Sequence, residues 1–208
     1  CVLSHRYWLT LAVKNMCDGP QIGRDDVLLT AQPFSYMDPQ WNMATAMLAG
    51  APLVILDGFH PSTFWDSIAR YGVTYVYVLG AMPTLLLKME PGASERAHRL
   101  TRVYCSAIPV ERHRELEERF GVPWYETYGM TEIGGATAVT REDHDELVGT
   151  GCIGTPNSFR EVRVIDANDD PVPVGAEGEL IVRGVGRMDR YLNDMCANAA
   201  SFRNGWFH

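Results

Sequence analysis

The feature that most constrains this chain is a repeated alternation between short apolar segments and longer amphipathic segments. The apolar segments are rich in β-branched and aromatic residues, and we expect strands at 26–30, 52–56, 73–79, 102–106 and 123–127. Helices are expected at 4–16, 37–50, 61–70, 82–89 and 110–120. This alternation predicts an α/β fold, a parallel sheet flanked by helices, with ligands bound at the carboxyl ends of the strands.

The character of the sequence changes after Arg141, where Gly, Pro and Asp turns separate strand-like segments at 162–165 and 179–183. We therefore expect a small β-rich lobe to follow the α/β part. The predicted division is 1–147 for the α/β subdomain and 148–208 for the lobe.

Charge and composition exclude several classes of protein. The net charge is -8, and residues 105–208 carry all of the acidic excess. No stretch concentrates Lys and Arg, which argues against a nucleic-acid partner. No apolar run approaches the roughly 18 to 20 residues of a membrane span, so we expect a soluble, cytoplasmic protein.

Cysteine and histidine give no sign of a metal centre. The five cysteines are scattered, odd in number and lack a CxxC pair, which predicts reduced structural thiols. The six histidines are far apart and form no ligand spacing. The acidic segment 142–146 lacks the glycine and the spacing of a calcium loop, so we expect a solvated loop there.

The stretch Tyr125–Glu132 carries the clearest chemistry, because it follows a predicted buried strand and contains a glycine turn. Such a turn can present backbone amides, a hydroxyl and a carboxylate to one ligand. Thr131 could donate to a phosphate oxygen, and Glu132 could hold Mg²⁺, which prefers oxygen ligands. The same pattern also fits a purely structural turn.

The string Tyr128–Glu132 (YGMTE) resembles the signature of the adenylate-forming superfamily, which includes acyl-CoA synthetases. Ser106–Pro109 resembles the adenine-binding loop of that family, and Gly178–Leu180 resembles its Gly-Glu-Leu segment. Gly205–His208 is similar to the start of its Gly-Trp-x-x-Thr-Gly-Asp motif. The sequence around Trp65 resembles that of the branch containing crotonobetaine- and carnitine-CoA ligases more than that of long-chain fatty acyl ligases.

The resemblance implies a nucleotide site made of two segments. Ser106, Ala107, Ile108 and Pro109 would line the adenine, and Glu126 would receive its exocyclic amine. Tyr128 would stack on the purine, with Thr127, Gly129 and Met130 beside it. Thr131 would contact the α-phosphate, and Glu132 would bind Mg²⁺; these last two are the expected catalytic residues.

A second set of residues is expected to bind the acid. It comprises Tyr36, Met37, Asp38 and Trp41 together with Gly80, Ala81 and Met82. Tyr36 stands at the position where many relatives have His, which is a departure from the family pattern. Asp38 could pair with a cationic group of the substrate, although a helix-capping or exposed Asp is the simpler interpretation.

The function implied is that of an ATP-dependent carboxylate–CoA ligase, an acid–thiol ligase of fatty-acid-type metabolism, with ATP, Mg²⁺ and coenzyme A. Two alternatives stay open: a non-catalytic nucleotide-binding remnant, and an amino-acid-activating domain. A small carboxylic acid is the expected partner, and a homodimer is left open. The family's phosphate loop would precede Cys1 and its C-terminal domain would follow His208, so we expect this piece to be inactive alone.

Overall fold

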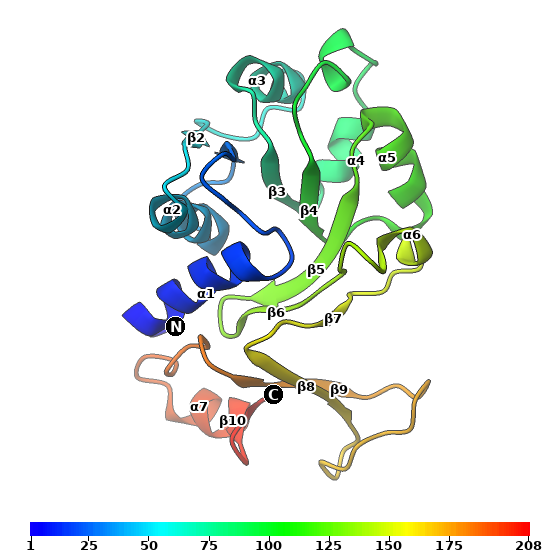
Figure 1. Cartoon of the computed structure of the whole chain (residues 1–208). Helices are drawn as coiled ribbons and strands as arrows, with labels where there is room; N and C mark the ends of the chain where they lie inside the picture. Colours follow the sequence, from blue (N-terminus) through cyan, green and yellow to red (C-terminus); the bar gives the residue numbers. More distant parts are fainter.

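A computed structural model describes residues 1–208 and places the five expected strands next to one another in a seven-stranded sheet (Figure 1). The first five strands run parallel, whereas the last two are antiparallel, so the sheet is mixed. Its strands, given in chain order, are β1 (Leu28–Thr30), β2 (Leu53–Ile55), β3 (Tyr75–Leu79), β4 (Arg102–Ser106), β5 (Trp124–Met130), β6 (Gly134–Ala138) and β7 (Thr155–Pro156). Their spatial order is β2-β1-β3-β4-β5-β6-β7.

The helices around this sheet are α1 (His5–Cys17), α2 (Met37–Ala49), α3 (Phe64–Tyr71), α4 (Met82–Leu87), α5 (His113–Phe120) and α6 (His144–Leu147), with 3₁₀ turns η1 (Ala93–Glu95) and η2 (Val110–Arg112). Helices α2 to α5 connect the parallel strands, as the alternation predicts, whereas α1 precedes β1 and α6 lies between β6 and β7. The side chain of Ser4 caps α1 by accepting from the amide of Tyr7. Gly50 ends α2 with φ of 69°, a conformation that glycine adopts without strain.

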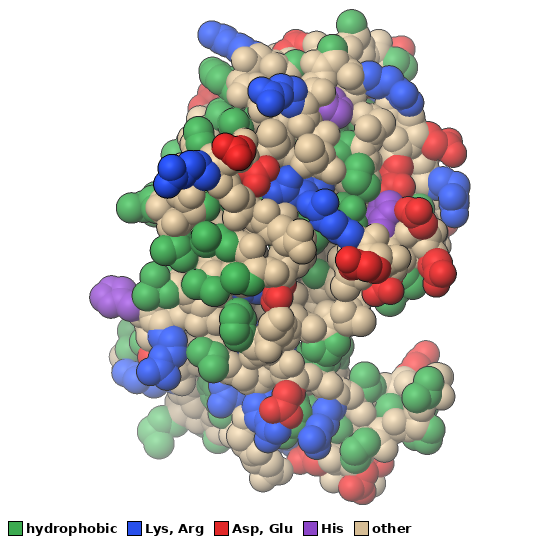
Figure 2. Space-filling model, in the orientation of Figure 1, with side chains coloured by type: hydrophobic (Ala, Val, Ile, Leu, Met, Phe, Trp, Pro, Cys, Tyr) green, Lys and Arg blue, Asp and Glu red, His purple; other side chains and the backbone are tan.

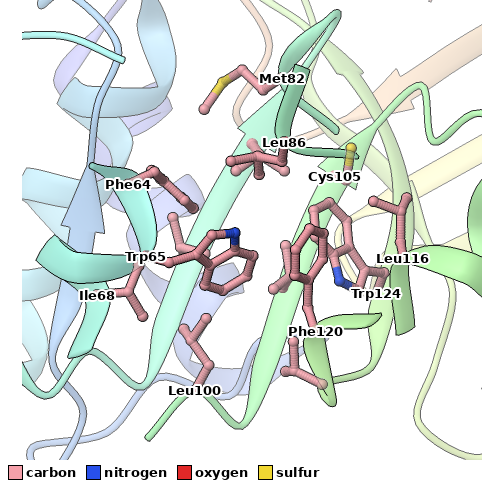
Figure 3. Close-up of a cluster of buried hydrophobic side chains, with 14 of the residues drawn as sticks. Phe64, Trp65, Ile68, Met82, Leu86, Leu100, Cys105, Leu116, Phe120 and Trp124 are labelled. Atoms are coloured by element: carbon pink, nitrogen blue, oxygen red, sulfur yellow. The ribbon is translucent and has the colours of Figure 1, made fainter. Parts of the chain in front are cut away.

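Alternate residues of the parallel strands build two different faces of the sheet. One face packs Leu29, Val76 and Val103 against α3, α4 and α5 in an apolar cluster of 19 buried residues (Figure 3). Trp65 and Phe120 meet at its centre, with ring centroids 4.3 Å apart. The opposite face presents tyrosines toward α1 and α2, and it forms a smaller cluster.

The expected β-rich lobe is a four-stranded antiparallel sheet in the order β10-β11-β9-β8. It consists of β8 (Arg160–Ile165), β9 (Glu179–Gly184), β10 (Phe202–Arg203) and β11 (Trp206–Phe207), with α7 (Met195–Ser201) beside it. Because β7 still belongs to the first sheet, the change of sheet falls between β7 and β8. The division after residue 147 stays a prediction.

Exposed hydrophobic side chains gather over α1 and α2 (Figure 2). Among them are Leu9, Met43, Met47 and Leu48, whose exposed fractions range from 41% to 78%. None of the helices combines the length and the apolar character needed to cross a bilayer.

Candidate functional site

The signature segment Tyr128–Glu132 lies in a β-hairpin. The prediction of a turn at Tyr128 and Gly129 is wrong. Strand β5 continues through both residues to Met130, because β6 folds back and pairs with them antiparallel. The ladder shifts register between Tyr128 and Gly129. A side chain at Gly129 would place its Cβ 2.5 Å from the carbonyl oxygen of Gly134, so the close approach of the two strands requires glycine.

Glu126 holds in place the loop Ser106–Pro109, the predicted adenine loop. Its two carboxylate oxygens accept the backbone amides of Ala107 and Ile108, each at 2.8 Å. These charge-assisted bonds fix Ala107 in a left-handed conformation with φ of 68°, which is unfavourable for a residue with a side chain. Burial raises the pKa of Glu126, and the two amides oppose that shift. Each oxygen keeps a further lone pair that can accept another hydrogen bond. That Glu126 accepts one from the adenine amine stays a prediction.

Three residues from two distant parts of the chain hold the hairpin tip that carries Thr131 and Glu132. The hydroxyl of Tyr7, on α1, donates to the backbone oxygen of Thr131 at 2.8 Å. From the lobe, Tyr191 donates to Oε1 of Glu132 at 3.0 Å, and the amide of Met188 donates to its backbone oxygen at 2.7 Å. Glu132 is thereby oriented, while its second carboxylate oxygen keeps no protein partner and fits a hard cation.

The two predicted sets of residues meet in one open cleft at the carboxyl ends of the strands. The nucleotide set contributes Ser106, Ala107, Gly129, Met130 and Thr131 to this cleft, and the acid set contributes Tyr36, Met37, Asp38, Trp41 and Gly80. The cleft therefore lies at the end of the sheet where the α/β pattern predicts that ligands bind.

Several predicted residues lie away from this cleft. Met82 and Ile108 are 7% and 5% exposed and belong to the apolar cluster, where the sulfur of Met82 accepts a hydrogen bond from Gln32. Ala81 is exposed beside Met82, and Pro109 precedes η2, neither of them lining the cleft. Their predicted binding roles stay predictions.

Behind the cleft lies a narrow inner cavity between the tyrosine-rich face of the sheet and helices α1 and α2. Thr127 and Tyr128 line it, together with Tyr75 and Tyr104. Asp38, Trp41, Tyr77, Ser106 and Gly129 line both the cavity and the cleft, so the two spaces adjoin.

Asp38 is unusual because it is 5% exposed and Oδ2 of its carboxyl has no hydrogen-bond partner. Burial raises the pKa of Asp38 to about 6. The simpler interpretation, an exposed or capping Asp, is therefore wrong: α2 has Tyr36 at its cap position, and Asp38 faces the cavity.

Sequence reasoning missed Lys14, which is 7% exposed and lines the inner cavity. A signal was present: Tyr7, Leu11 and Lys14 are spaced so that they share one face of α1, and the first two are apolar core residues. A lysine on that face is a buried charge, which is rare without a function.

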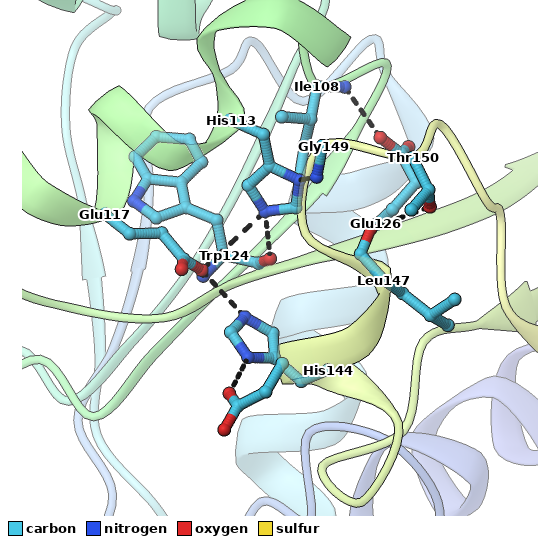
Figure 4. A network of polar contacts seen from close by, with 10 residues as sticks. Ile108, His113, Glu117, Trp124, Glu126, His144, Leu147, Gly149 and Thr150 are labelled. Carbon is cyan, nitrogen blue, oxygen red and sulfur yellow. Dashed lines mark hydrogen bonds and ion pairs between the residues drawn. The ribbon is translucent and has the colours of Figure 1, made fainter.

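The histidines, expected to be unrelated, include a pair that the fold brings together (Figure 4). His144, on α6, places Nε2 2.7 Å from a carboxylate oxygen of Glu117 on α5, and Nδ1 3.0 Å from a carboxylate oxygen of its neighbour Asp145. His113 accepts the amide of Gly149 at Nδ1, so its Nε2 carries the proton and donates to the backbone oxygen of Trp124. The remainder of segment 142–146 is exposed, as expected.

These contacts join His113, Glu117 and His144 in one hydrogen-bonded network. Neither nitrogen of His113 keeps a free lone pair, and both nitrogens of His144 face carboxylates. Although burial of Glu117 opposes it, the His113 and His144 rings and the amide of Trp124 lower the pKa of Glu117 to about 2. The hydrogen bond to Glu117 raises the pKa of His144. The network thus ties α6 to α5 and β5, next to the adenine loop.

Solved structures share this architecture and define its class. The N-terminal domain of FACL13 from Mycobacterium tuberculosis superposes with a TM-score of 0.85 at 19% identity, covering 98% of this chain and 52% of that one. The o-succinylbenzoate CoA synthetase of Bacillus subtilis, solved with AMP, gives 0.85 at 24% identity over 99% of this chain and 42% of that one. The fold is that of the N-terminal domain of acyl-CoA synthetases.

The sequence comparisons identify the family. The AMP-binding enzyme family matches residues 1–192, and the chain belongs to it. Crotonobetaine/carnitine–CoA ligase of Escherichia coli is 29% identical over 190 residues, and sulfoacetate–CoA ligase of Cupriavidus necator is 30% identical over 187. These alignments cover 88% and 89% of this chain but 36% of each relative, so the chain spans about a third of their length.

Proposed function

We propose that this chain supplies the adenine- and acid-binding part of an AMP-forming carboxylate–CoA ligase. In the first half-reaction, a carboxylate oxygen of the acid attacks the α-phosphorus of ATP, and pyrophosphate leaves. In the second, the thiol sulfur of coenzyme A attacks the acyl carbon, AMP leaves, and the thiol proton passes to solvent. Both steps depend on positioning and electrostatic stabilisation rather than on a protein nucleophile.

One observation carries the proposal: the adenine loop, Thr131 and the inner cavity with its buried Asp38 meet at a single cleft. Ala107 lines the cleft, where the bonds from Glu126 hold the loop rigid. Thr131 lines the same cleft from the hairpin tip, and the inner cavity adjoins it. An acid in the cavity would therefore direct its carboxylate toward a nucleotide lying between the loop and the hairpin.

The residues at the hairpin tip would bind and orient the phosphates. The hydroxyl of Thr131 would donate to an α-phosphate oxygen, because its own backbone is fixed by Tyr7. Glu132, oriented by Tyr191, would hold Mg²⁺ through its unpartnered oxygen. When bound, that ion supplies positive charge that offsets the negative charge developing on the phosphates.

The acid itself is a further part of the proposal. The relatives are named for different acids, so their names fix no single substrate. The inner cavity is narrow and presents Asp38 and several tyrosines, which favours a small, polar acid over a long alkyl chain.

Acid-dependent exchange of radioactive pyrophosphate into ATP tests the first half-reaction. The assay uses the complete protein of the native reading frame and a panel of short, branched, aromatic and betaine-type acids. We expect exchange with a subset of polar acids, and a loss of at least about 100-fold in Glu132→Ala because one cation ligand is removed. Glu146→Ala, which changes an exposed glutamate, is the matched control.

Two results would contradict the proposal. Exchange that survives unchanged in Glu132→Ala would remove Glu132 from the site. A folded protein that binds ATP but exchanges with no acid would support a non-catalytic nucleotide-binding domain instead.

A further inference from the structure

The inner cavity contains a buried cation that no protein group neutralises. The ammonium group of Lys14 makes no hydrogen bond or ion pair, and Asp18 is the one acidic group whose charge favours its protonated form. Asp18 is itself engaged, because it accepts the amide of Ser158 at 3.0 Å and its hydroxyl at 2.6 Å. A buried charge without a partner is strongly unfavourable, so the fold retains it against a stability cost.

The surroundings of Lys14 include further buried polar groups that make no hydrogen bond. Nδ2 of Asn157 is buried and makes no hydrogen bond. Both groups lie over Gly135: a Cβ at that position would be 3.3 Å from Nζ of Lys14 and 3.5 Å from Nδ2 of Asn157. The hydroxyl of Tyr104, which lines the same cavity, is also buried without a partner. This end of the cavity therefore favours a group that accepts hydrogen bonds and carries negative charge.

Lys14 lies at the end of the cavity that is remote from the reacting centre. It lines the inner cavity but not the open cleft, whereas Asp38 lines both. An acid whose carboxylate lies at Thr131 would therefore pass Asp38 before it reaches Lys14. Ionised Asp38 repels a negative group beside it, so a second anion is favoured only at the far end.

We infer that the substrate acid carries a second anionic group, a carboxylate or a sulfonate, and that Lys14 binds this group at the inner end of the cavity. This inference rests on the proposed function, since it names the class of acid that the same site takes. Burial lowers the pKa of Lys14 only to about 8, so the ammonium form predominates at neutral pH. The anionic group of the substrate would then pair with the Lys14 ammonium group, which has no ion-pair partner within the protein.

The test compares acids that differ only at the far end. Pyrophosphate exchange by the complete protein is measured with linear dicarboxylates from malonate to adipate, with ω-sulfonated acids, and with monocarboxylates of matching length. We expect at least one dianionic acid to exceed its matched monoacid by about 10-fold or more in kcat/KM, the effect of one charge-assisted bond. The dicarboxylate and sulfonate series show which anion fits better.

Two variants and a control locate the effect. Lys14→Met removes the charge at nearly constant length and should abolish the dianion preference while leaving monoacid exchange in place. Gly135→Ala crowds the ammonium group and should weaken the preference a few-fold by a separate route. Lys88→Met changes an exposed lysine and should leave the preference intact.

The outcomes separate the inference from the proposed function. Exchange that favours monoacids, or a dianion preference that persists in Lys14→Met, would overturn the role of Lys14 and leave adenylation standing. Absence of exchange with every acid, in a folded protein that binds ATP, would overturn the proposed function and this inference with it.

Discussion

The face of the seven-stranded sheet under α3, α4 and α5 is packed with aliphatic and aromatic side chains, whereas the face under α1 and α2, called the polar face here, carries tyrosines and encloses a cavity that Asp38 and Lys14 also line. Both faces come from alternate residues of the same strands: Val76 and Val103 point one way, Tyr75 and Tyr104 the other. The apolar face buries carbon and stabilises the fold. Both faces leave polar atoms unpaired: the indole nitrogens of Trp65 and Trp124 lie within the apolar cluster, whereas Oδ2 of Asp38 lies at the cavity, where a ligand can pair with it.

The largest expected effect lies on the apolar face. Phe120 is fully buried against Trp65, so Phe120→Ala should lower the free energy of unfolding by about 3–5 kcal/mol. On the polar face, Tyr104→Phe removes a buried hydroxyl that has no partner and should change stability by less than about 0.5 kcal/mol. Urea denaturation followed by circular dichroism measures both. Equal losses in the two variants would break the comparison.

The adenine loop should depend on Glu126 to an intermediate degree. Glu126→Gln keeps one acceptor but loses the charge that holds the amides of Ala107 and Ile108, so AMP affinity should fall by about 2 kcal/mol, roughly 30-fold. Isothermal titration calorimetry of AMP binding is the measurement. Glu111→Gln, at an exposed glutamate near the same loop, should bind AMP normally. An unchanged affinity in Glu126→Gln would mean that the loop is rigid without this carboxylate.

On the polar face, removing a charge should stabilise the protein. The pKa of Asp38 is raised, so its ionised form is disfavoured in the folded state; the penalty is full above about pH 6 and disappears below the ordinary pKa near 4. Asp38→Asn should therefore raise the free energy of unfolding at pH 8 by on the order of 1–2 kcal/mol, after allowance for solvent screening. The gain should fade as the pH falls from 6 to 4. A destabilised variant at pH 8 would show that Asp38 has a stabilising partner.

The smallest effect concerns the network around His144. Its pKa is raised in the folded state, so its stabilisation is complete below about pH 6.5 and is lost as the pH rises through the folded pKa. His144→Phe should cost about 1 kcal/mol at pH 6 and less at higher pH. Denaturation of both proteins across this range measures the difference. A cost that does not change with pH would show that His144 stabilises by packing alone.

Much of the α/β part could be predicted because it depends on local patterns. The expected strand at 102–106 and the helix at 37–50 agree with β4 and α2 to within one residue, since Gly50 and the apolar run mark their ends. Strand β5 was predicted too short. Its last residues pair antiparallel with β6, and the residues of the motif alone do not indicate this pairing.

The candidate site could be predicted only in part, for the same physical reason. Asp38, Gly80, Ala107 and Thr131 line one cleft, and their binding roles stay predictions. The burial of Lys14 could not be predicted because it depends on which distant residues pack against that face of α1. The contact between His144 and Glu117 joins residues 27 positions apart, which no local spacing encodes.

The central claim is that the polar face holds the acid and the neighbouring cleft holds the nucleotide. A crystal structure of the complete protein with a non-hydrolysable acyl-adenylate analogue tests it most directly. We expect adenine against Ala107, the phosphate within hydrogen-bonding distance of the Thr131 hydroxyl, and the acyl group in the cavity beside Asp38. A nucleotide bound elsewhere, or an acyl group that leaves this cavity empty, would contradict it.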